Sequence, residues 1–144
     1  MAKIVLISCV KRKLKGAKNV PAKDMYNSPL FKKAWAYAKS LNSDKIYILS
    51  AKHGLLNPDT KIDYYDESLV NASVSKRKEW TDKVLTQMKD AGLDTQNNTF
   101  IFLAGKVYYD YLQKELTNCE FPYAGKGSIG YILQFLTQEL KSLK

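Results

Sequence analysis

The sequence predicts an α/β fold of three layers, in which a small parallel sheet carries helices on both faces. Three apolar runs, residues 4–7, 46–49 and 100–103, are rich in β-branched and aromatic side chains. Each run is continuous rather than alternating, as expected for strands covered on both faces. Helical patterns separate the runs and follow the last one, so the order is β-α-β-α-β-α-α. This order implies right-handed crossovers and a parallel sheet.

The helices are predicted from capping residues and apolar spacing. Ser28 followed by Pro29 is typical of a helix start, and the apolar spacing continues to residue 41. A second helix is expected over residues 73–91, because Gly92 supplies a stop signal directly after it. The remaining helices are expected over residues 107–116 and 129–143.

Length and composition exclude several classes of protein. The 144 residues suit one domain with a single core, residues 1–144, and 45% of them are hydrophobic, which excludes a disordered chain. The longest apolar run is far shorter than the ~20 residues that a membrane span needs. It leads into a basic segment without the small-residue cleavage site of a secretory signal. We therefore expect a cytoplasmic protein that has no membrane partner.

The net charge of +9 lies in the first quarter of the chain. Residues 1–40 hold ten Lys or Arg and one Asp, whereas residues 41–144 hold thirteen side chains of each sign. Basic loops between buried strands and helices suit polyanions. The charge therefore favours a nucleotide or a nucleic acid, DNA or RNA, as the partner.

Cysteine and glycine spacings give no sign of a metal or a cofactor. Cys9 and Cys119 show no metal-type spacing, and the chain has one histidine. A single disulfide between the two cysteines stays open. Gly125, Gly127 and Gly130 match the letters of the dinucleotide fingerprint, but they do not follow a first strand. No P-loop sequence occurs either, so we expect neither a metal nor a cofactor.

Segments that follow the three predicted strands have a common chemistry. Residues 8–11, 50–54 and 104–106 each combine small residues with a lysine. Ligands of parallel sheets bind beyond the carboxyl ends of the strands. The glycine-rich turn of residues 125–130, which carries Lys126 before a helix, either cradles phosphate or permits close helix packing. These four segments predict the basic entrance of a ligand-binding pocket.

The first basic segment and the first helix start each have two interpretations. Ser8 is suited to hydrogen-bond a ligand while Lys11 and Lys13 hold phosphate, but the lysines also fit a solvated loop. Cys9 fits either an activated thiol or, as we favour, a small buried residue. Tyr26 precedes a helix start, where free N–H groups favour an anion, and it either stacks on a base or sugar or packs at the helix entry.

The most specific segment places the only histidine between Lys52 and Gly54, after Ser50. His53 is a candidate for proton transfer, and Asp63, Asp66 and Glu67 offer a carboxylate either for proton transfer or for binding a ribose hydroxyl. The alternative is a histidine that hydrogen-bonds within its loop, and acids that are solvated. A Ser-His-Asp hydrolase fits poorly, because no G-x-S-x-G elbow occurs and Ser50 is too close in sequence to the histidine.

These segments together resemble a family of small bacterial and phage proteins whose function is unassigned. The resemblance spans almost the whole chain and is sharpest in the Ser-Ala-Lys-x-Gly-Leu sequence of residues 50–55. The family is distantly similar to the YaaA peroxide-stress proteins, which are associated with DNA binding, and to uracil-DNA-glycosylase-like domains. The resemblance implies a Rossmann-like fold and a nucleotide context. The family's shared residues fall on Ser8, Lys11, Tyr26, Ser50, Lys52, Gly54, Tyr65 and Gly105.

The leading hypothesis is a protein that binds a phosphate-bearing nucleotide, free or within nucleic acid, at the carboxyl edge of its sheet. Whether it is an enzyme stays open; an enzyme would be an N-glycosidase or glycosyl transferase that uses His53 with Asp63 or Asp66. The alternative is a non-catalytic DNA- or RNA-binding protein, or a phage or bacterial accessory protein that sequesters a nucleotide. The expected ligand-binding residues are Ser8, Lys11, Lys13, Tyr26, Ser50, Lys52, Gly54, Tyr65, Gly105, Tyr108, Gly125, Gly127 and Ser128.

Overall fold

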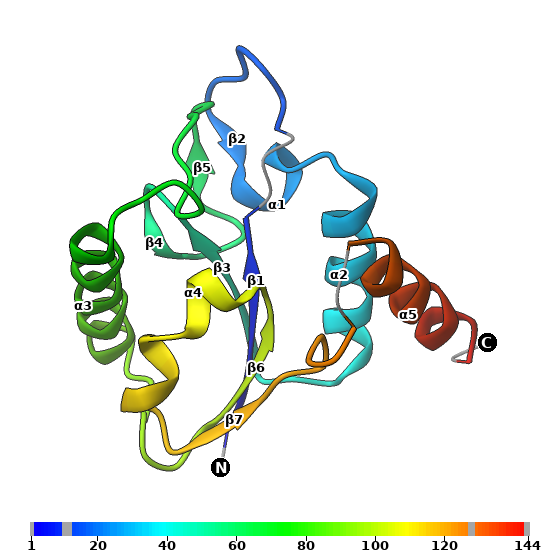
Figure 1. Ribbon diagram of the computed structural model, residues 1–144. Coiled ribbons are helices and arrows are strands. Elements are labelled where there is room, and N and C mark those ends of the chain that lie inside the picture. The colour runs from blue at the N-terminus through cyan, green and yellow to red at the C-terminus, as the bar shows by residue number, and fades with distance from the viewer. Residues whose placement is uncertain (1, 10–12, 127–128, 143–144) are drawn as a thin grey trace.

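A computed structural model describes residues 2–9, 13–126 and 129–142 of the chain (Figure 1). Its strands are β1 (Lys3–Ser8), β2 (Val20–Pro21), β3 (Lys45–Ser50), β4 (Gly54–Leu56), β5 (Lys61–Ile62), β6 (Thr99–Leu103) and β7 (Asn118–Glu120). Its helices are α1 (Ala22–Met25), α2 (Pro29–Ser40), α3 (Val74–Asp90), α4 (Lys106–Tyr109), the 3₁₀ turn η1 (Leu112–Glu115) and α5 (Ile129–Lys141).

The central sheet confirms the predicted α/β class. It has five strands in the order β4-β3-β1-β6-β7, and β1, β3, β6 and β7 are parallel. The three predicted runs form its centre, with β1 between β3 and β6. The edge strand β4 is antiparallel to β3, because a short turn reverses the chain after Ser50. Helix α3 lies on one side of the sheet and helices α2 and α5 lie on the other, which gives three layers (Figure 1).

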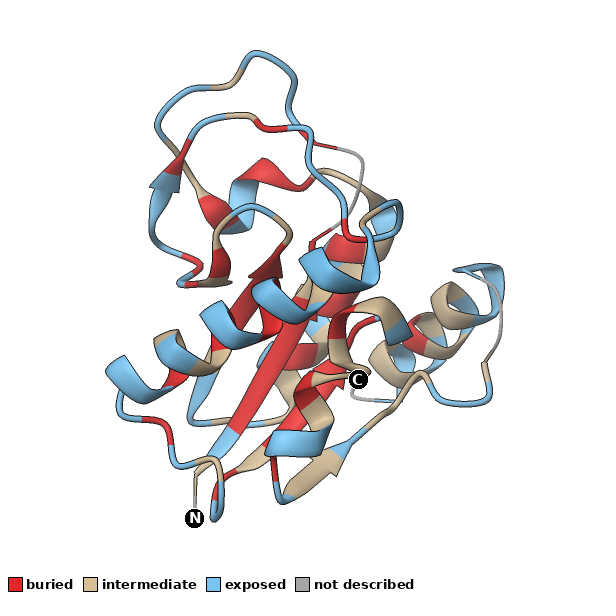
Figure 2. Ribbon diagram, turned by 60° about the vertical axis from the view of Figure 1, so that its left-hand side comes forward, coloured by how far each residue is buried: buried red, intermediate tan, exposed pale blue. Residues whose placement is uncertain are grey.

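The core lies between these layers. The side chains of residues 4–7 and 100–103 are almost completely buried, as their continuous apolar runs predict (Figure 2). Within the described residues, no helix is long and apolar enough to span a membrane.

The helix starts follow the predicted capping. Ser28 Oγ accepts the backbone N–H of Phe31 at 3.1 Å, and Ser73 Oγ accepts that of Lys76 at 3.2 Å. The expectation of one helix over residues 107–116 is wrong, because this segment is divided into α4 and η1. Its β-branched and aromatic side chains have low helix propensity, which explains why a regular helix does not persist.

A second, smaller sheet was not predicted. Strands β2 and β5 form an antiparallel ribbon of two residues each. The ribbon and α1 lie beyond the carboxyl end of β1 (Figure 1). They bring the segments around Lys13, Tyr26 and Tyr65 to that end of the sheet, where the site is expected.

Candidate functional site

The carboxyl ends of β1 and β3 lie side by side. Ser8 is in register with Leu49, and the backbone N–H of Cys9 donates to Leu49 O at 2.9 Å. Ser50, the last residue of β3, is completely buried, whereas Ser8 is half-buried. Because β6 pairs with β1 from the other side, Ala104 and Gly105 follow a neighbouring strand end.

Three hydroxyl groups form a buried chain at this edge. Ser50 Oγ donates to the Tyr65 hydroxyl at 2.8 Å, and the hydroxyls of Tyr65 and Tyr26 are 2.6 Å apart. Ser50 Oγ also accepts the backbone N–H groups of Lys52 and His53 at 3.3 and 3.0 Å. Three residues that the sequence singled out separately therefore form one hydrogen-bonded unit, here called the hydroxyl chain (Ser50, Tyr65 and Tyr26).

A count of protons shows what the hydroxyl chain still offers. Its three hydroxyls carry three protons, and the two hydrogen bonds between them use two. Since Ser50 donates to Tyr65, the remaining proton belongs to one of the two tyrosines. Burial raises the pKa of both Tyr26 and Tyr65, so both hydroxyls stay protonated near neutral pH. Among the described side chains this third proton has no acceptor, which leaves the chain ready to donate to one more oxygen.

Lys13 lies beside the hydroxyl chain and is only 7% exposed. Its backbone forms an isolated antiparallel bridge with Tyr26, and its ammonium lies 4.7 Å from the centroid of the Tyr65 ring. No carboxylate of the described residues forms an ion pair with it, and residues 10–12 (Val-Lys-Arg) carry no carboxylate in their sequence. The site therefore combines a mostly buried lysine side chain with a spare hydroxyl proton, and both favour an anion.

The His53 ring packs against one side of the hydroxyl chain. Its ring meets the Tyr65 ring edge-on at 5.4 Å between centroids, and its Nε2 is buried with no hydrogen-bond partner among the described residues. Burial lowers the pKa of His53, and the charges of Lys52 and Lys83 lower it further. The neutral imidazole is therefore favoured, and it can accept or donate one hydrogen bond according to its tautomer.

Cys9 and Tyr108 extend the cluster toward α4. Cys9 Sγ and the Tyr108 hydroxyl are 3.2 Å apart, and both side chains are buried. Burial raises the pKa of Tyr108. Cys9 and Cys119 are both free thiols, so the disulfide left open by the sequence does not form. Cys9 is a small buried residue, which is the interpretation that the sequence favoured.

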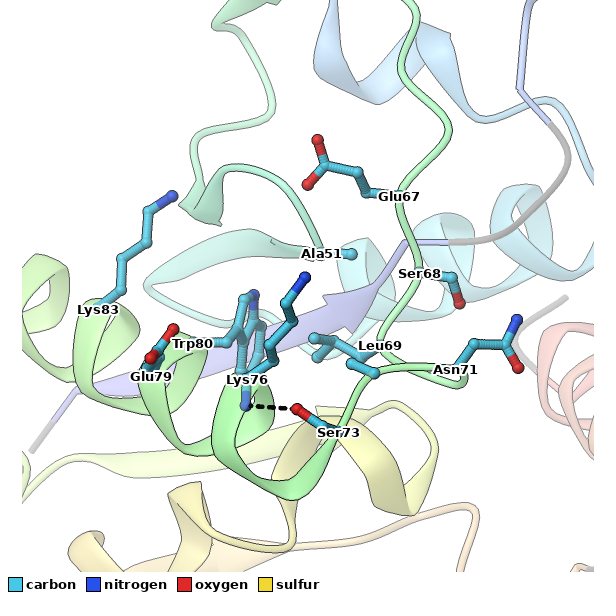
Figure 3. Close-up of a pocket in the computed structure, with 11 residues that line it drawn as sticks. Ala51, Glu67, Ser68, Leu69, Asn71, Ser73, Lys76, Glu79, Trp80 and Lys83 are labelled. Carbon is cyan, nitrogen blue, oxygen red and sulfur yellow. Dashed lines mark hydrogen bonds between the residues drawn. The ribbon is translucent and has the colours of Figure 1, made fainter.

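A groove of about 630 Å³ lies next to the site (Figure 3). It begins at Ala51, directly after Ser50, and its floor includes the buried side chains of Leu69 and Trp80. Its rim carries lysines and glutamates, among them Lys76 and Glu67. The Trp80 indole donates to Ser50 O at 2.8 Å, so the groove and the hydroxyl chain have a common wall.

Other predicted residues of this region have different environments. Lys52 is exposed, and the residues proposed as carboxylate partners of His53, Asp63 and Asp66, are exposed as well. Asp63 accepts the backbone N–H of Asn19 at 2.8 Å, which ties the chain before β2 to the chain after β5. Gly54 adopts a positive φ of +75° and packs against Gln87, so its lack of a side chain has a structural cause.

The β6 side of the edge has a separate, smaller cavity. Gly105 and Lys106 line about 130 Å³ together with the aromatic side chains of Tyr109, Phe121 and Tyr123. Gly125 has a φ of +77°, and the ammonium of Lys126 lies 4.9 Å from the Phe135 ring centroid. The four segments that were expected to form one basic pocket entrance therefore lie in two separate places. The predicted ligand-binding residues Lys11, Gly127 and Ser128 lie outside the described residues.

Helix α3 contributes three residues that sequence reasoning missed. Besides the Trp80 indole, Lys83 Nζ donates to Lys52 O at 2.8 Å and Gln87 Nε2 donates to His53 O at 2.9 Å. Their spacing along one helix face is a possible signal, but polar residues at such spacing usually face solvent. Within the described residues, no three His, Cys, Asp or Glu side chains are grouped so as to hold a metal ion.

Comparison with known proteins gives a family. The model of a family of unknown function, DUF6884, matches residues 4–138. The chain belongs to this family. It is also 30% identical, over 149 aligned residues, to the uncharacterized protein YfjM of Bacillus subtilis (strain 168), with 98% of this chain and 97% of the relative covered. No solved structure matches the chain. The DUF6884 match confirms the resemblance to an uncharacterised family, whereas similarity to YaaA proteins and glycosylase-like domains stays a prediction.

Proposed function

We propose that this protein binds a nucleotide, free or within a nucleic acid, through its phosphate at the carboxyl ends of β1 and β3. One observation carries the proposal: Lys13 is buried without a carboxylate partner, next to a hydroxyl chain that has one proton to donate. The predicted phosphate role of Lys13 is kept in this proposal, whereas Tyr26 and Tyr65, expected to contact a base or sugar, are now proposed to donate to phosphate through the hydroxyl chain that Ser50 begins.

The energetics of Lys13 favour an anionic ligand. Burial of a lysine removes part of the hydration of its ammonium, which costs free energy, and a cation–π contact returns ~0.5–2 kcal/mol according to how far the cation is desolvated. An anionic oxygen beside the lysine would accept hydrogen bonds from both the ammonium and the spare tyrosine hydroxyl. Charge-assisted hydrogen bonds of this kind are about twice as strong as neutral ones. Phosphate suits the site because it offers several oxygens to donors that converge from different segments.

The neighbouring groove favours a nucleotide over a free phosphate ion. Its volume of about 630 Å³ is within the range of pockets for small organic ligands. Its apolar floor of Leu69 and Trp80 suits a base, and the polar rim suits a ribose. In this proposal the ligand extends from the phosphate site to the groove, whose lining includes Ala51, the residue after Ser50. The similarity to nucleic-acid-associated families, which stays a prediction from the sequence, implies the same ligand class.

Cleavage of an N-glycosidic bond stays a prediction. His53 is near the proposed phosphate site and has an unpartnered nitrogen, as an acid or base requires. The carboxylates expected to assist it are exposed, and that of Asp63 binds the Asn19 backbone. Incubation with nucleotides, NAD and damaged DNA, followed by detection of free base, tests this step separately from binding.

The binding proposal is tested by calorimetric titration with nucleoside 5′-monophosphates and with the matching nucleosides. We expect the monophosphates to bind at least ~10-fold more tightly, because each charge-assisted hydrogen bond contributes ~1.5–3 kcal/mol. Equal affinity for nucleosides, or no binding of either, would contradict the proposal. Titration of a short double-stranded oligonucleotide over a range of salt concentrations distinguishes a nucleic-acid ligand from a free nucleotide. The affinity for B-DNA falls by ~0.9 log units per log unit of salt concentration for each neutralised phosphate.

A further inference from the structure

Side chains of α3 hold the turn between β3 and β4 through hydrogen bonds to its backbone, in addition to the hydrogen bonds within the turn. Gln87 makes two of these contacts: its Nε2 donates to His53 O at 2.9 Å, and its Oε1 accepts the backbone N–H of Leu55 at 2.7 Å. The Trp80 indole holds Ser50 O from the same helix. The primary amide of Gln87 thus bridges the two residues that flank Gly54.

Gly54 makes this bridge possible. A Cβ at this position would lie 2.2 Å from Gln87 Oε1, and its three nearest heavy atoms would all belong to the Gln87 amide. The amide therefore occupies the space that a side chain would take. Any other residue at position 54 would displace Gln87 from the backbone of the turn.

The bridge acts on groups of the proposed phosphate site. Within the turn, the backbone N–H of His53 donates to Ser50 Oγ, which begins the hydroxyl chain. The His53 ring packs edge-on against Tyr65, the middle member of that chain. A shift of the turn would therefore move the Ser50 hydroxyl and the His53 ring together. Gln87 itself is half-buried and is not part of the groove lining.

We propose that Gln87 is a positioning residue for the phosphate site: it sets the ligand affinity through the turn of residues 50–55 without touching the ligand. The inference rests on the proposed function. Supporting residues of this kind fix the geometry of groups that bind a ligand, and small displacements of such groups weaken binding. Because Gln87 lies on a long helix whose buried face is formed by other residues, its replacement should leave the fold intact.

The test compares Gln87→Met with Gln138→Met. Both changes replace glutamine by an apolar side chain of similar length, but Gln138 is exposed on α5 and has no side-chain hydrogen bond among the described residues. The probes are adenosine 5′-monophosphate and inorganic phosphate, measured by calorimetry. The ring signals of His53, the only histidine, report the turn in NMR spectra without any ligand.

We expect Gln87→Met to weaken binding of the probes ~5–10-fold and to shift the His53 ring signals. The loss of two hydrogen bonds to the turn should also lower the thermal midpoint by ~2–8 °C, with the fold kept. Gln138→Met should change none of these. Unchanged affinity with shifted His53 signals would overturn the positioning role and leave the proposed function standing. Weaker binding with unmoved His53 signals would also overturn it, since Gln87 would then act by another route. If the wild-type protein binds neither probe, the proposed function fails and this inference fails with it.

Discussion

The two sides of the carboxyl edge differ in how their polar groups are arranged. On the β1–β3 side, buried hydroxyls bond to one another beside the mostly buried side chain of Lys13. On the β6 side, Lys106 is exposed and Lys126 lies over an aromatic ring. The buried hydroxyl of Tyr123 there has no hydrogen-bond partner among the described residues.

The comparison shows that lysines at strand ends are not equivalent. An exposed lysine is solvated, so it gains little from a bound anion at physiological salt. A mostly buried lysine has lost part of its hydration, so an anion beside it replaces some of the water that burial removed and is less screened by salt. Burial is therefore the reason why the proposed function uses the β1–β3 side for a phosphate, although both sides carry similar residues in the sequence.

The largest effect should come from Lys13→Met compared with Lys106→Met. Loss of Lys13 should weaken nucleoside monophosphate binding ~100-fold, since a charged hydrogen bond contributes up to ~3 kcal/mol. Removing an unpaired buried charge should leave the free energy of unfolding unchanged or raise it. Lys106→Met should change the affinity less than ~2-fold. Calorimetry and chemical denaturation measure both quantities, and equal losses of affinity in the two variants would break the comparison.

The next effect compares two buried tyrosines. Tyr65→Phe should lower the free energy of unfolding by ~1–3 kcal/mol, because the Ser50 hydroxyl loses its acceptor and the Tyr26 hydroxyl loses its partner. Tyr123→Phe removes a buried hydroxyl that has no partner among the described residues, so stability should stay the same or rise. Urea denaturation of both variants tests this. A larger loss in Tyr123→Phe would show that the β6 side is the more tightly bonded region.

A smaller difference in stability is expected between alanine variants of two glycines that have similar backbone conformations. Gly54 and Gly125 have φ values of +75° and +77°, so alanine at either position costs ~1–2 kcal/mol of backbone strain. Around Gly125 a Cβ would meet nothing within 4 Å, whereas at Gly54 it would displace the Gln87 amide. Gly54→Ala should therefore lower the free energy of unfolding by ~1 kcal/mol more than Gly125→Ala does. In a Gln87→Ala background this excess should disappear, and its persistence would contradict the proposed contact.

The smallest effect is the pH dependence that His53 brings to the β1–β3 side. Its pKa is lowered by burial and by Lys52 and Lys83 from an ordinary value near 6.5, so the folded state binds this proton less readily than the unfolded state. The contribution to stability is full above about pH 6.5 and is lost as the pH falls toward the folded-state pKa. NMR titration of the ring should give a pKa below that of an unstructured peptide. In Lys83→Met the pKa should rise, and a value that does not move would exclude the charge effect.

Much of the fold could be predicted because its signals are local. The runs at residues 4–7, 46–49 and 100–103 form the sheet centre, and Ser28 and Ser73 cap their helices as the sequence indicates. The ribbon of β2 and β5 could not be predicted, since two-residue strands carry no periodicity.

The site was predictable as a set of residues but not as an arrangement. Tyr26, Ser50 and Tyr65 were each selected, yet the hydrogen bond between the tyrosines joins residues 39 positions apart. The burial of Lys13 depends on the chain returning to pair with Tyr26, which no local pattern encodes. Gln87 was missed because a polar residue on a helix usually faces water, and its role arises only from the neighbouring turn.

A crystal structure of the protein grown with a nucleoside 5′-monophosphate would test the central claim most directly. We expect a phosphate oxygen within ~3 Å of Lys13 Nζ. A second hydrogen bond from the hydroxyl of Tyr26 or Tyr65 should reach the same phosphate group. Phosphate bound instead beside Gly105 and Lys106, with no ligand atom near Lys13, would contradict the account.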